Sequence, residues 1–341
     1  MDNMGVTIKD IAEKADVSIS TVSKSLNNKP GVSQATRQRI INIAKELDYF
    51  SFHSQAHLKS HNIAFIMTRR HIPIFNNPFY TRVIAGVEIE VENYDYNLLF
   101  STIKLADLNK KEIPPIISQN KVDGLILAGA DINYELIRAI EKLKFPTVLV
   151  DNYLKSPLLD CIVSDNYNGT MEAVRYLIKK GHKKIGYAGG PLTHPSFQER
   201  FKAYKMELMD NNMTINNDII KIHKNFNQKM GVELAKEFLK EELPSAIFAA
   251  NDAIALGLLQ TFKKYGHKIP EEVSLVGFDN IEITAYTSPS ITTVNINKEG
   301  MGQEAARKLF DRIDNPEKKA TKSVIPTELI ERESVKCLPI P

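Results

Sequence analysis

From Ile63 onward the sequence alternates short apolar runs with longer amphipathic stretches, and this alternation limits the fold more than any other feature. The apolar runs have the length of strands, and the amphipathic stretches carry apolar residues at helical spacing. Repeated β-α units of this kind form parallel sheets with helices on both faces. Because about 280 residues hold two series of such units, we predict an α/β core of two doubly wound parallel-sheet subdomains.

The individual elements follow from where each run begins and ends. We predict strands at Ile63–Met67, Asn97–Thr102, Val122–Leu127, Thr147–Val150, Lys184–Ala188, Ile219–Ile222, Ser245–Ala249 and Ser274–Gly277. We predict helices at Phe79–Tyr94, Tyr134–Leu143, Gly169–Lys180, Gln198–Asn211, Met230–Glu241 and Ala253–Tyr265. Ligands of open parallel sheets bind outside the carboxyl ends of the strands, so we expect a binding site there.

The first sixty or so residues show a different pattern, that of three short helices. A first helix begins after Thr7 and carries one apolar stripe at positions i, i+3, i+4 and i+7. Ser18 is a good N-cap for a second helix over Ile19–Leu26, and the Asn27–Gly31 segment ends that helix. Ser33 caps a third helix. The short turn between the first two helices is typical of a helix-turn-helix.

The spacing alone leaves two uses of this module open. In DNA-binding versions the second helix enters the major groove, and its outward side chains here are Ile19, Ser20, Ser23 and Lys24. The alternative is a plain three-helix bundle that contacts other proteins. Residues 1–61 hold eight positive and six negative side chains, a weak net charge that favours DNA only modestly. We favour DNA binding because of the spacing.

The Thr7–Ala12 segment (TIKDIA) and the Val17–Asn27 segment (VSISTVSKSLN) form a dense, ungapped signature. This signature resembles that of lactose-repressor-type (LacI family) transcription regulators. The resemblance implies that Ile19, Ser20 and Lys24 read base edges. Lys9 would assist them from the first helix. The DNA-binding residues that the resemblance implies are Thr7, Lys9, Ser18, Ile19, Ser20, Thr21, Ser23, Lys24, Asn27 and Leu58.

The sequence departs from the family pattern at several positions. Lys24 stands where arginine is common, and lysine lacks the planar fork that binds guanine bidentately. Asp16 stands where glycine is usual in the turn; Asp tolerates a left-handed backbone better than most residues, so we expect the motif to survive. The connector keeps the spacing of Tyr49 and Leu58 but lacks the Pro, Asn, Ala and Arg of the family. The resemblance gives Leu58 the role of a wedge in the minor groove.

The connector also carries His53, His57 and His61 at positions i, i+4 and i+8. On a helix these three side chains would share one face. A metal site is one interpretation, but acidic or thiolate partners are lacking nearby. We favour a solvated stripe that faces DNA phosphates, and we predict neither a bound metal nor a cofactor.

Short landmarks through the rest of the chain resemble the sugar-binding core of the same family, which is related to periplasmic binding proteins. Each landmark is weak alone, so the resemblance depends on their order and coverage. They are Asn77–Tyr80, Val122–Gly124, Asp165–Asn166, Gly181–Ile185, Glu199–Arg200, Ala250–Gly257, Val276–Asp279 and Pro326–Ile330. The resemblance implies a homodimer that binds a pseudo-palindromic operator in double-stranded DNA, controlled by a small-molecule effector of the carbohydrate class.

A sugar site needs aromatic faces against C–H surfaces, together with charged or amide groups that hold hydroxyls. By match to the family pattern, two phenylalanines would stack on the ligand and an arginine would donate a fork of hydrogen bonds. Amide and carboxylate groups would bind from the opposite lip. The ligand-binding residues that the resemblance implies are Phe79, Asp151, Arg200, Phe226, Asn251 and Asp279.

Structural roles stay open for three of these residues. Phe79 could belong to the core at the start of a helix, Asp279 could be a turn residue, and Arg200 could form a structural ion pair. Asp165–Asn166 is expected to cap the helix that follows, and Gly181–His182 to end one. We therefore leave these two pairs out of the site.

We expect three parts along the chain: a helix-turn-helix domain over 1–48, a hinge over 49–61, and an effector-binding and dimerisation core over 62–341. The resemblance implies that the core crosses between its subdomains three times. The first subdomain would hold about 62–162 and 293–322, and the second about 163–292 and 323–341. Such crossings form a hinge that ligand closure can bend.

Other classes of protein fit the sequence less well. It has no run of eighteen apolar residues and no secretion signal, so we expect a cytoplasmic protein with no membrane partner. Its two cysteines suit a reducing cytosol. Motifs of dinucleotide binding, P-loops, zinc proteases and serine hydrolases are absent, so we predict no enzyme. The alternatives are a transporter's solute-binding protein and an enzyme of carbohydrate metabolism with an accessory bundle.

Overall fold

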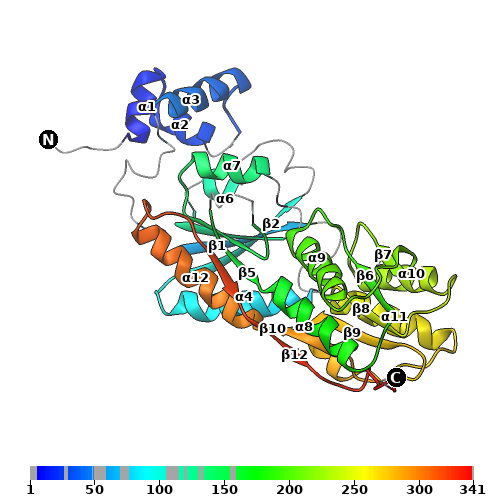
Figure 1. Ribbon diagram of the computed structural model, residues 1–341. Helices are drawn as coiled ribbons and strands as arrows, with labels where there is room; N and C mark the ends of the chain where they lie inside the picture. The colour runs from blue at the N-terminus through cyan, green and yellow to red at the C-terminus, as the bar shows by residue number, and fades with distance from the viewer. Residues whose placement is uncertain are drawn as a thin grey trace.

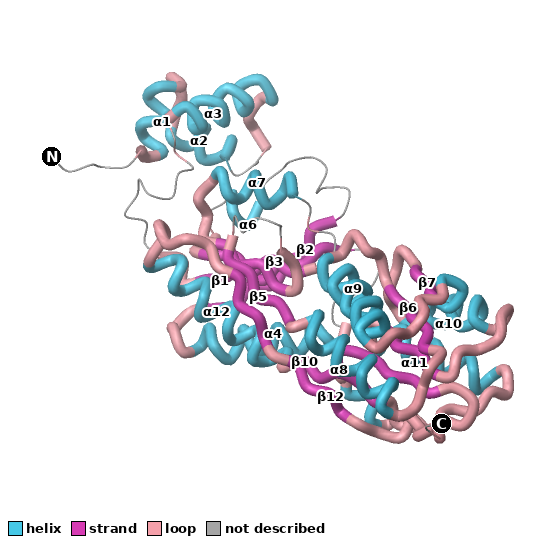
Figure 2. Tube along the Cα trace, in the orientation of Figure 1, coloured by secondary structure: helices cyan, strands magenta, loops and turns pink. Residues whose placement is uncertain are grey.

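Two sheets and their covering helices form the core of the computed structural model, and three small N-terminal helices stand apart from it (Figure 1). The tube view separates the strands of the two sheets from the helices around them (Figure 2). Among the described residues, none of the helices has the length and apolar character needed to cross a membrane. The structure describes residues 6–26, 30–47, 49, 59–69, 77–104, 115–118, 121–129, 132, 134–153 and 159–339.

The N-terminal module consists of α1 (Ile8–Lys14), α2 (Ile19–Leu26) and α3 (Gln34–Glu46), which confirms the three predicted helices. Thr7 begins α1 with a capping box: its Oγ1 accepts a hydrogen bond from the backbone N–H of Asp10 (3.3 Å), and the Asp10 carboxylate accepts one from the backbone N–H of Thr7 (2.6 Å). The apolar stripes meet in one small core of Ile11, Ala12, Ala15, Val22, Ile40 and Ala44.

The turn between α1 and α2 has the left-handed backbone that we expected at Asp16, whose φ is 49°. Aspartate is among the few residues that adopt this conformation at small cost. Arg39 of α3 reaches back and donates a hydrogen bond from Nη2 to the carbonyl oxygen of Ala15 (2.7 Å), at the end of α1. A cation at a helix C-terminus is stabilising, so α3 fixes the turn as well as the core.

The first sheet is entirely parallel and has the strand order β11-β5-β4-β3-β1-β2. With its helices it forms what we call the first lobe. Its strands are β1 (Asn62–Arg69), β2 (Asn97–Lys104), β3 (Gly124–Ala128), β4 (Thr147–Val150), β5 (Asp160–Ser164) and β11 (Lys322–Ile325). Its helices are α4 (Pro78–Glu92), α6 (Pro115–Ser118), α7 (Tyr134–Lys142) and α12 (Lys298–Asp314).

The second sheet has the order β12-β10-β9-β8-β6-β7, and only β12 runs antiparallel, against β10. With its helices it forms the second lobe. Its strands are β6 (Ile185–Gly189), β7 (Ile220–Ile222), β8 (Ala246–Ala249), β9 (Ser274–Asp279), β10 (Thr292–Ile296) and β12 (Thr327–Ile330). Its helices are α8 (Asn166–Lys179), α9 (Pro195–Asp210), η2 (Asn217–Ile219), α10 (Gln228–Phe238), α11 (Asp252–Lys264) and η3 (Glu282–Ala285).

Alternation along the buried strands explains why helices cover both faces of each sheet. In β1, Ile63 and Phe65 pack into the cluster that contains α4 and α12, whereas Ala64 and Ile66 pack into the cluster that contains α6 and α7. Successive side chains of a strand point to opposite faces. Because the Ile63–Met67 stretch of β1 is apolar at every position, it needs a helical layer on each side, as the sequence predicts.

The chain crosses between the lobes a few residues later than we expected at each of three places. The crossings follow β5, β10 and β11, at Asp165, Asn297 and Pro326, in place of about 162, 293 and 322. The return is later because β10 pairs with both β9 and β12 in the second sheet. The last crossing is later because β11 pairs with β5 in the first sheet.

Two helices of the first lobe, α4 and α12, touch through glycine. A Cβ atom on Gly86 would lie 2.0 Å from the carbonyl oxygen of Glu299, and one on Gly302 would lie 2.0 Å from that of Val83. Such distances fall far inside van der Waals contact, so any side chain at either position would push the helices apart. The two glycines thus set how closely α12, which begins at a crossing, lies against α4.

Candidate functional site

The second helix of the N-terminal module presents three of the predicted base-reading side chains to solvent. Ile19 is 53% exposed, and Ser20 and Lys24 are also exposed. On the opposite side Val22 is fully buried, and the buried Ser25 donates its hydroxyl to the carbonyl oxygen of Thr21 (2.8 Å). The helix therefore has one face for packing and one that is available to a groove of DNA.

The remaining predicted DNA-binding residues are placed differently. Ser18 is the N-cap: its Oγ accepts from the backbone N–H of Thr21 (3.1 Å) and lies 2.8 Å from the Thr21 hydroxyl. Thr7 serves the capping box of α1, beside the exposed Lys9. Ser23 is half-buried. Asn27 and Leu58 lie outside the described residues, as do His53 and His57.

The predicted ligand-binding groups gather where the carboxyl ends of strands meet the space between the lobes. Asp151 follows β4 of the first lobe, Asp279 ends β9 of the second, and Asn251 follows β8. Arg200 projects from α9. Residues 70–76, 130–131 and 154–158, which follow β1, β3 and β4 in sequence, lie outside the described part of this edge.

Arg200 and Asp279 form a buried ion pair, with Nη1 of the arginine 3.2 Å from Oδ1 of the aspartate. Nη1 also donates to the carbonyl oxygen of Ala250 (2.6 Å), and Nε donates to Oδ1 of Asn166 (2.8 Å). The guanidinium carbon lies 3.7 Å from the ring centroid of Phe278. No described residue accepts a hydrogen bond from Nη2, so the fork keeps donors for a ligand.

Asp279 has an unusual backbone conformation, and its carboxyl group has a raised pKa. Its φ of 110° is unusual for a residue with a side chain. Burial raises the pKa of Asp279 to about 6, while Arg200 and Lys298 act against that rise. A carboxylate in this state gains from any ligand hydroxyl that donates to it, because such a bond stabilises the charged form.

Asp151 joins the two lobes through two hydroxyl groups. Its Oδ2 accepts from the Tyr80 hydroxyl of α4 (3.0 Å), and its Oδ1 accepts from the Ser196 hydroxyl of α9 (2.9 Å). Its φ of 55° places it in the left-handed region. Tyr80 belongs to the first lobe and Ser196 to the second. A change in the distance between the lobes would therefore lengthen or break one of the two hydrogen bonds to Asp151.

Asn251 and the two predicted aromatic residues have mainly structural contacts. Asn251 caps α11 by accepting from the backbone N–H of Ile254 (2.9 Å), and its Nδ2 donates to the carbonyl oxygen of Phe226 (2.9 Å). The Phe226 ring lies 5.0 Å from that of Phe197. Phe79 is 8% exposed and belongs to the core at the start of α4, as the alternative interpretation held.

Other residues at the site could not be predicted from the family pattern. Tyr80 and Ser196 hold Asp151, and Asn166, which we had assigned only to a helix cap, binds Arg200. Asp165 does cap α8, because its Oδ1 accepts from the backbone N–H of Asn168 (3.1 Å). The only sequence signal for Ser196 was its position one helical turn before Arg200.

Two more contacts join the lobes at the margins of this site. The Tyr153 hydroxyl donates to Oε1 of Glu199 (2.6 Å). Arg82 of α4 lies between two carboxylates, with Nη1 3.1 Å from Glu299 of its own lobe and Nη2 3.5 Å from Glu282 of the other. The lobes are therefore held together by polar contacts that a change of angle would alter.

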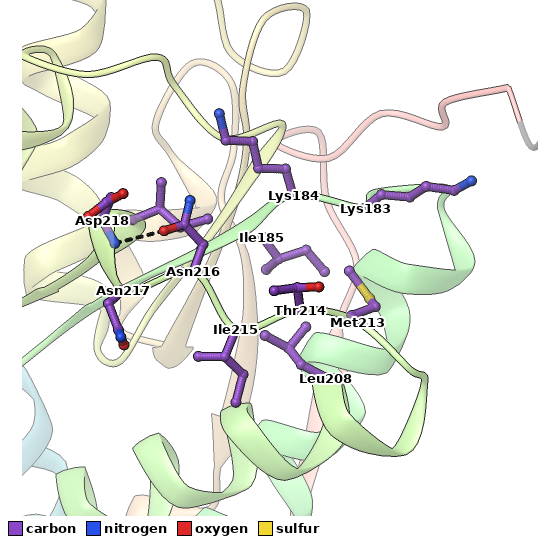
Figure 3. Close-up of a pocket in the computed structure, with 11 residues that line it drawn as sticks. Lys183, Lys184, Ile185, Leu208, Met213, Thr214, Ile215, Asn216, Asn217 and Asp218 are labelled. Atoms are coloured by element: carbon purple, nitrogen blue, oxygen red, sulfur yellow. Dashed lines mark hydrogen bonds between the residues drawn. The ribbon is translucent and has the colours of Figure 1, made fainter.

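A hollow of about 550 Å³ lies elsewhere in the described structure, beside the amino end of β6 (Figure 3). Ile185, Leu208 and Met213 contribute apolar side chains to it, and the ammonium groups of Lys183 and Lys184 point away from them. The rest of its lining includes Thr214, Asn216, Asn217 and Asp218, and the Asn216 side chain already accepts from the backbone N–H of Asp218 (2.9 Å). This hollow lies at the amino end of its strand, whereas ligands of parallel sheets bind at the carboxyl ends, so the Arg200–Asp279 pair is the candidate effector site.

Asp252, behind the site, is a fully buried carboxyl group at the start of α11. Its Oδ1 accepts from the Thr293 hydroxyl (2.6 Å), and its Oδ2 accepts from the backbone N–H of Ile281 (2.8 Å). Burial, assisted by the charge of Asp279, raises the pKa of Asp252 to about 7. Asp252 therefore holds Ile281 and Thr293 in place, but above neutral pH its buried negative charge destabilises the folded protein.

We expect Asp252→Asn to stabilise the protein at pH 8 and to change its stability little near pH 4. The folded pKa exceeds the unfolded value of 3.8, so the stability contributed by Asp252 is complete below about pH 4 and is lost as the pH rises through 7. The asparagine oxygen can accept from the Ile281 N–H and its amide nitrogen can donate to the Thr293 hydroxyl, so the gain at pH 8 should be about 2–4 kcal/mol. Thermal unfolding midpoints across this pH range measure it, and parallel curves for the two proteins would contradict it.

Comparison with known proteins assigns both parts of the chain. Residues 7–51 match the model of bacterial regulatory proteins of the lacI family, and residues 174–335 match that of the periplasmic binding protein-like domain. The chain is 31% identical over 337 residues to the HTH-type transcriptional repressor PurR of Photobacterium profundum, covering 97% of this chain and 99% of that protein.

Two further relatives extend the comparison. The chain is 30% identical over 334 residues to the HTH-type transcriptional repressor CytR of Escherichia coli, covering 98% of this chain and 97% of that protein. The solved structure of a complex of the transcriptional regulator CelR with cellobiose superimposes with a TM-score of 0.74 at 26% identity, covering 96% of this chain and 99% of that one. The likeness spans the DNA-binding module and both lobes.

Proposed function

The chain belongs to the lacI family of bacterial regulatory proteins, as a DNA-binding transcriptional repressor, and from this premise we propose that a small carbohydrate bound between the two lobes controls its affinity for operator DNA. Ile19, Ser20 and Lys24 of α2 read the operator. The bound sugar changes the angle between the lobes and thereby the placement of the DNA-binding modules. Such control requires the sugar to bind the two states with different affinities.

The observation that carries this proposal is the polar cluster of Arg200, Asp279 and Asp151. It contains groups from both lobes: Arg200 is paired with the Asp279 carboxylate, and the charge of Asp151, which already accepts from the Tyr80 and Ser196 hydroxyls, acts on Asp279. A polyol that donates to the carboxylates and accepts from the guanidinium would satisfy all of them at once. A ligand that binds groups on both lobes favours the closed angle.

The carbohydrate class is supported by the mixture of these groups with aromatic rings. Phe226 lies half-buried beside this edge of the second lobe, and its carbonyl is fixed by Asn251. An aromatic face packs against the C–H face of a sugar ring. The related regulator CelR has been solved with cellobiose bound. In this proposal Asn251 acts by positioning Phe226, because its own amide is engaged by the protein.

The proposal is tested with a panel of mono- and disaccharides, nucleosides and amino acids. Thermal unfolding of the full chain identifies ligands that raise the midpoint, and DNA footprinting upstream of neighbouring genes identifies the operator. We expect a carbohydrate both to raise the midpoint and to change operator affinity. A response confined to nucleosides or amino acids would overturn the carbohydrate class. Stabilisation with unchanged operator affinity would overturn control by the ligand.

A second copy of the chain is the partner that we assign to one exposed face. On α4, Arg82 and Ile89 lie seven residues apart and so share a face, and Ile89 is 50% exposed. Arg82 contacts Glu282 of η3, which brings this face beside Ile283 and Tyr286, 55% and 79% exposed. The face runs across both lobes, so a dimer built on it would respond to the angle between them.

We expect Tyr286→Asp to shift the protein toward monomer and to weaken operator binding, because a charge would be buried in the interface and two modules bind a pseudo-palindromic site together. Met209→Asp is the matched control, since Met209 is 58% exposed on α9 of the second lobe. Sedimentation velocity measures the oligomeric state. A monomeric wild-type protein, or equal effects of the two variants, would contradict the assignment.

A further inference from the structure

At the junction where the chain enters the core from the DNA-binding side, one carboxylate accepts hydrogen bonds from two successive backbone N–H groups. Asp123 lies just before β3, and its Oδ1 accepts from the backbone N–H of Ser60 (2.9 Å). Its Oδ2 accepts from the backbone N–H of His61 (3.0 Å). Ser60 and His61 directly precede β1, and residues 50–58, which connect to the helix-turn-helix, come just before them in sequence. Hydrogen bonds to a charged group are the strong ones.

The two neighbours of β1 hold the same junction from both sides. The backbone N–H of Asn97, at the start of β2, donates to the carbonyl oxygen of His61 (2.8 Å). The backbone N–H of Asp123 donates to the carbonyl oxygen of Asn62 (2.8 Å). The His61 ring lies 5.0 Å from that of Tyr96. The junction is therefore fixed in direction although His61 and Lys59 are exposed.

The backbone at this junction is in a conformation that it would not adopt unaided. His61 has a φ of 51°, in the left-handed region, which disfavours residues with a side chain. Such a conformation persists only where the surroundings over-determine it. Here the surroundings are the Asp123 carboxylate and the β2 amide group, so removal of the carboxylate should release the direction in which the chain leaves the core.

We propose that Asp123 is a positioning residue for DNA recognition: by holding the N–H groups of Ser60 and His61, it sets the direction from which the core presents the connector and the helix-turn-helix to the operator. It touches neither DNA nor effector. A module presented from a fixed direction loses less freedom on binding a specific site, which raises specific affinity. Non-specific binding, which depends on phosphate attraction, does not need that direction. The proposal rests on the family's DNA binding and is independent of the carbohydrate assignment.

The test is a graded series at Asp123 in the full chain. Aspartate accepts from both N–H groups, asparagine from one, and alanine from neither. We expect Asp123→Ala to lower operator affinity about tenfold, Asp123→Asn to lower it less, and affinity for DNA without an operator to stay unchanged in both. Asp95→Asn is the matched control: Asp95 lies two residues before β2, is exposed, and has a φ of 57° that asparagine also tolerates.

Hydrogen exchange and thermal unfolding separate positioning from a merely structural role. The amides of Ser60 and His61 should exchange faster in the order alanine, asparagine, wild type. Simple destabilisation would lower specific and non-specific affinity together, and that result would overturn the proposal. Faster exchange with unchanged operator affinity would also overturn it. Should the alanine variant fold poorly, the ratio of specific to non-specific affinity in Asp123→Asn decides the question in the same way.

Discussion

Replacing Ile19, Ser20 and Lys24 together with alanine is expected to lower operator affinity by about 10²- to 10⁴-fold. All three side chains stand on the exposed face of α2, and each well-formed base contact discriminates by about 1–3 kcal/mol. Alanine is a strong helix former, and the buried Val22 and Ser25 are untouched. The helix should therefore remain folded while it loses the side chains that contact the bases. Fluorescence anisotropy with a labelled operator at fixed salt measures the loss.

The control for this experiment changes exposed residues on a different helix. Gln38 and Asn42 lie one turn apart on α3 and contact each other (3.3 Å). Their double replacement by alanine should leave operator affinity within about twofold, because surface changes away from special contacts shift stability by no more than about 0.5 kcal/mol. Equal operator binding by the α2 triple variant and wild type would remove α2 from the reading role. Unchanged effector binding by the triple variant would show that the core is intact.

Removing the charge of Arg200 should have the largest effect within the core. Arg200→Leu leaves the Asp279 carboxylate buried without its cation and the carbonyl of Ala250 without its donor. Breaking a buried pair by removing one partner costs about 3–5 kcal/mol. The thermal unfolding midpoint measures the loss. The deficit should be smaller at pH 5 than at pH 8, because protonated Asp279 no longer carries an uncompensated charge.

Arg200→Lys distinguishes the two roles of this residue. Lysine retains the positive charge but lacks the planar fork of donors, so it should recover part of the stability while sugar affinity stays at least about tenfold weaker than in the wild type. Full sugar affinity in Arg200→Lys would mean that Arg200 serves only as the ion-pair partner of Asp279. Full sugar affinity in any folded Arg200→Leu protein would remove Arg200 from the effector site altogether.

Local signals explain why the N-terminal module could be predicted closely. Caps at Thr7 and Ser18 and the apolar stripes act within a few residues, and the predicted second helix has the bounds of α2. In the core, β4 also has its predicted bounds. The strands β5 and β10 and the helix α12 were not predicted. Their pairing and packing join segments far apart in the sequence, and that long-range contact decides which lobe each belongs to.

The candidate site shows the same division between local and distant information. The resemblance pointed to Arg200 and Asp279, and the structure brings them together across 79 positions of sequence. The resemblance did not reveal that Asn166 holds Arg200 or that Ser196 holds Asp151. Hydroxyl and amide side chains of this kind are common on any helix. Only the packing of α8 and α9 at the edge of the second sheet gives them partners.

The ion pairs of Arg82 should make the relative position of the two lobes depend on ionic strength. Arg82 is half-exposed and forms ion pairs with Glu299 of its own lobe and with Glu282 of the other. Opening the lobes would break the pair with Glu282 and leave the pair with Glu299. Exposed pairs of this kind are worth at most about 1 kcal/mol and are screened within roughly 8–10 Å at physiological salt. We therefore expect rising salt to loosen the lobes as well as the hold on DNA phosphates. If operator affinity depends on the angle between the lobes, its slope against salt should differ from what counterion release from the DNA alone provides.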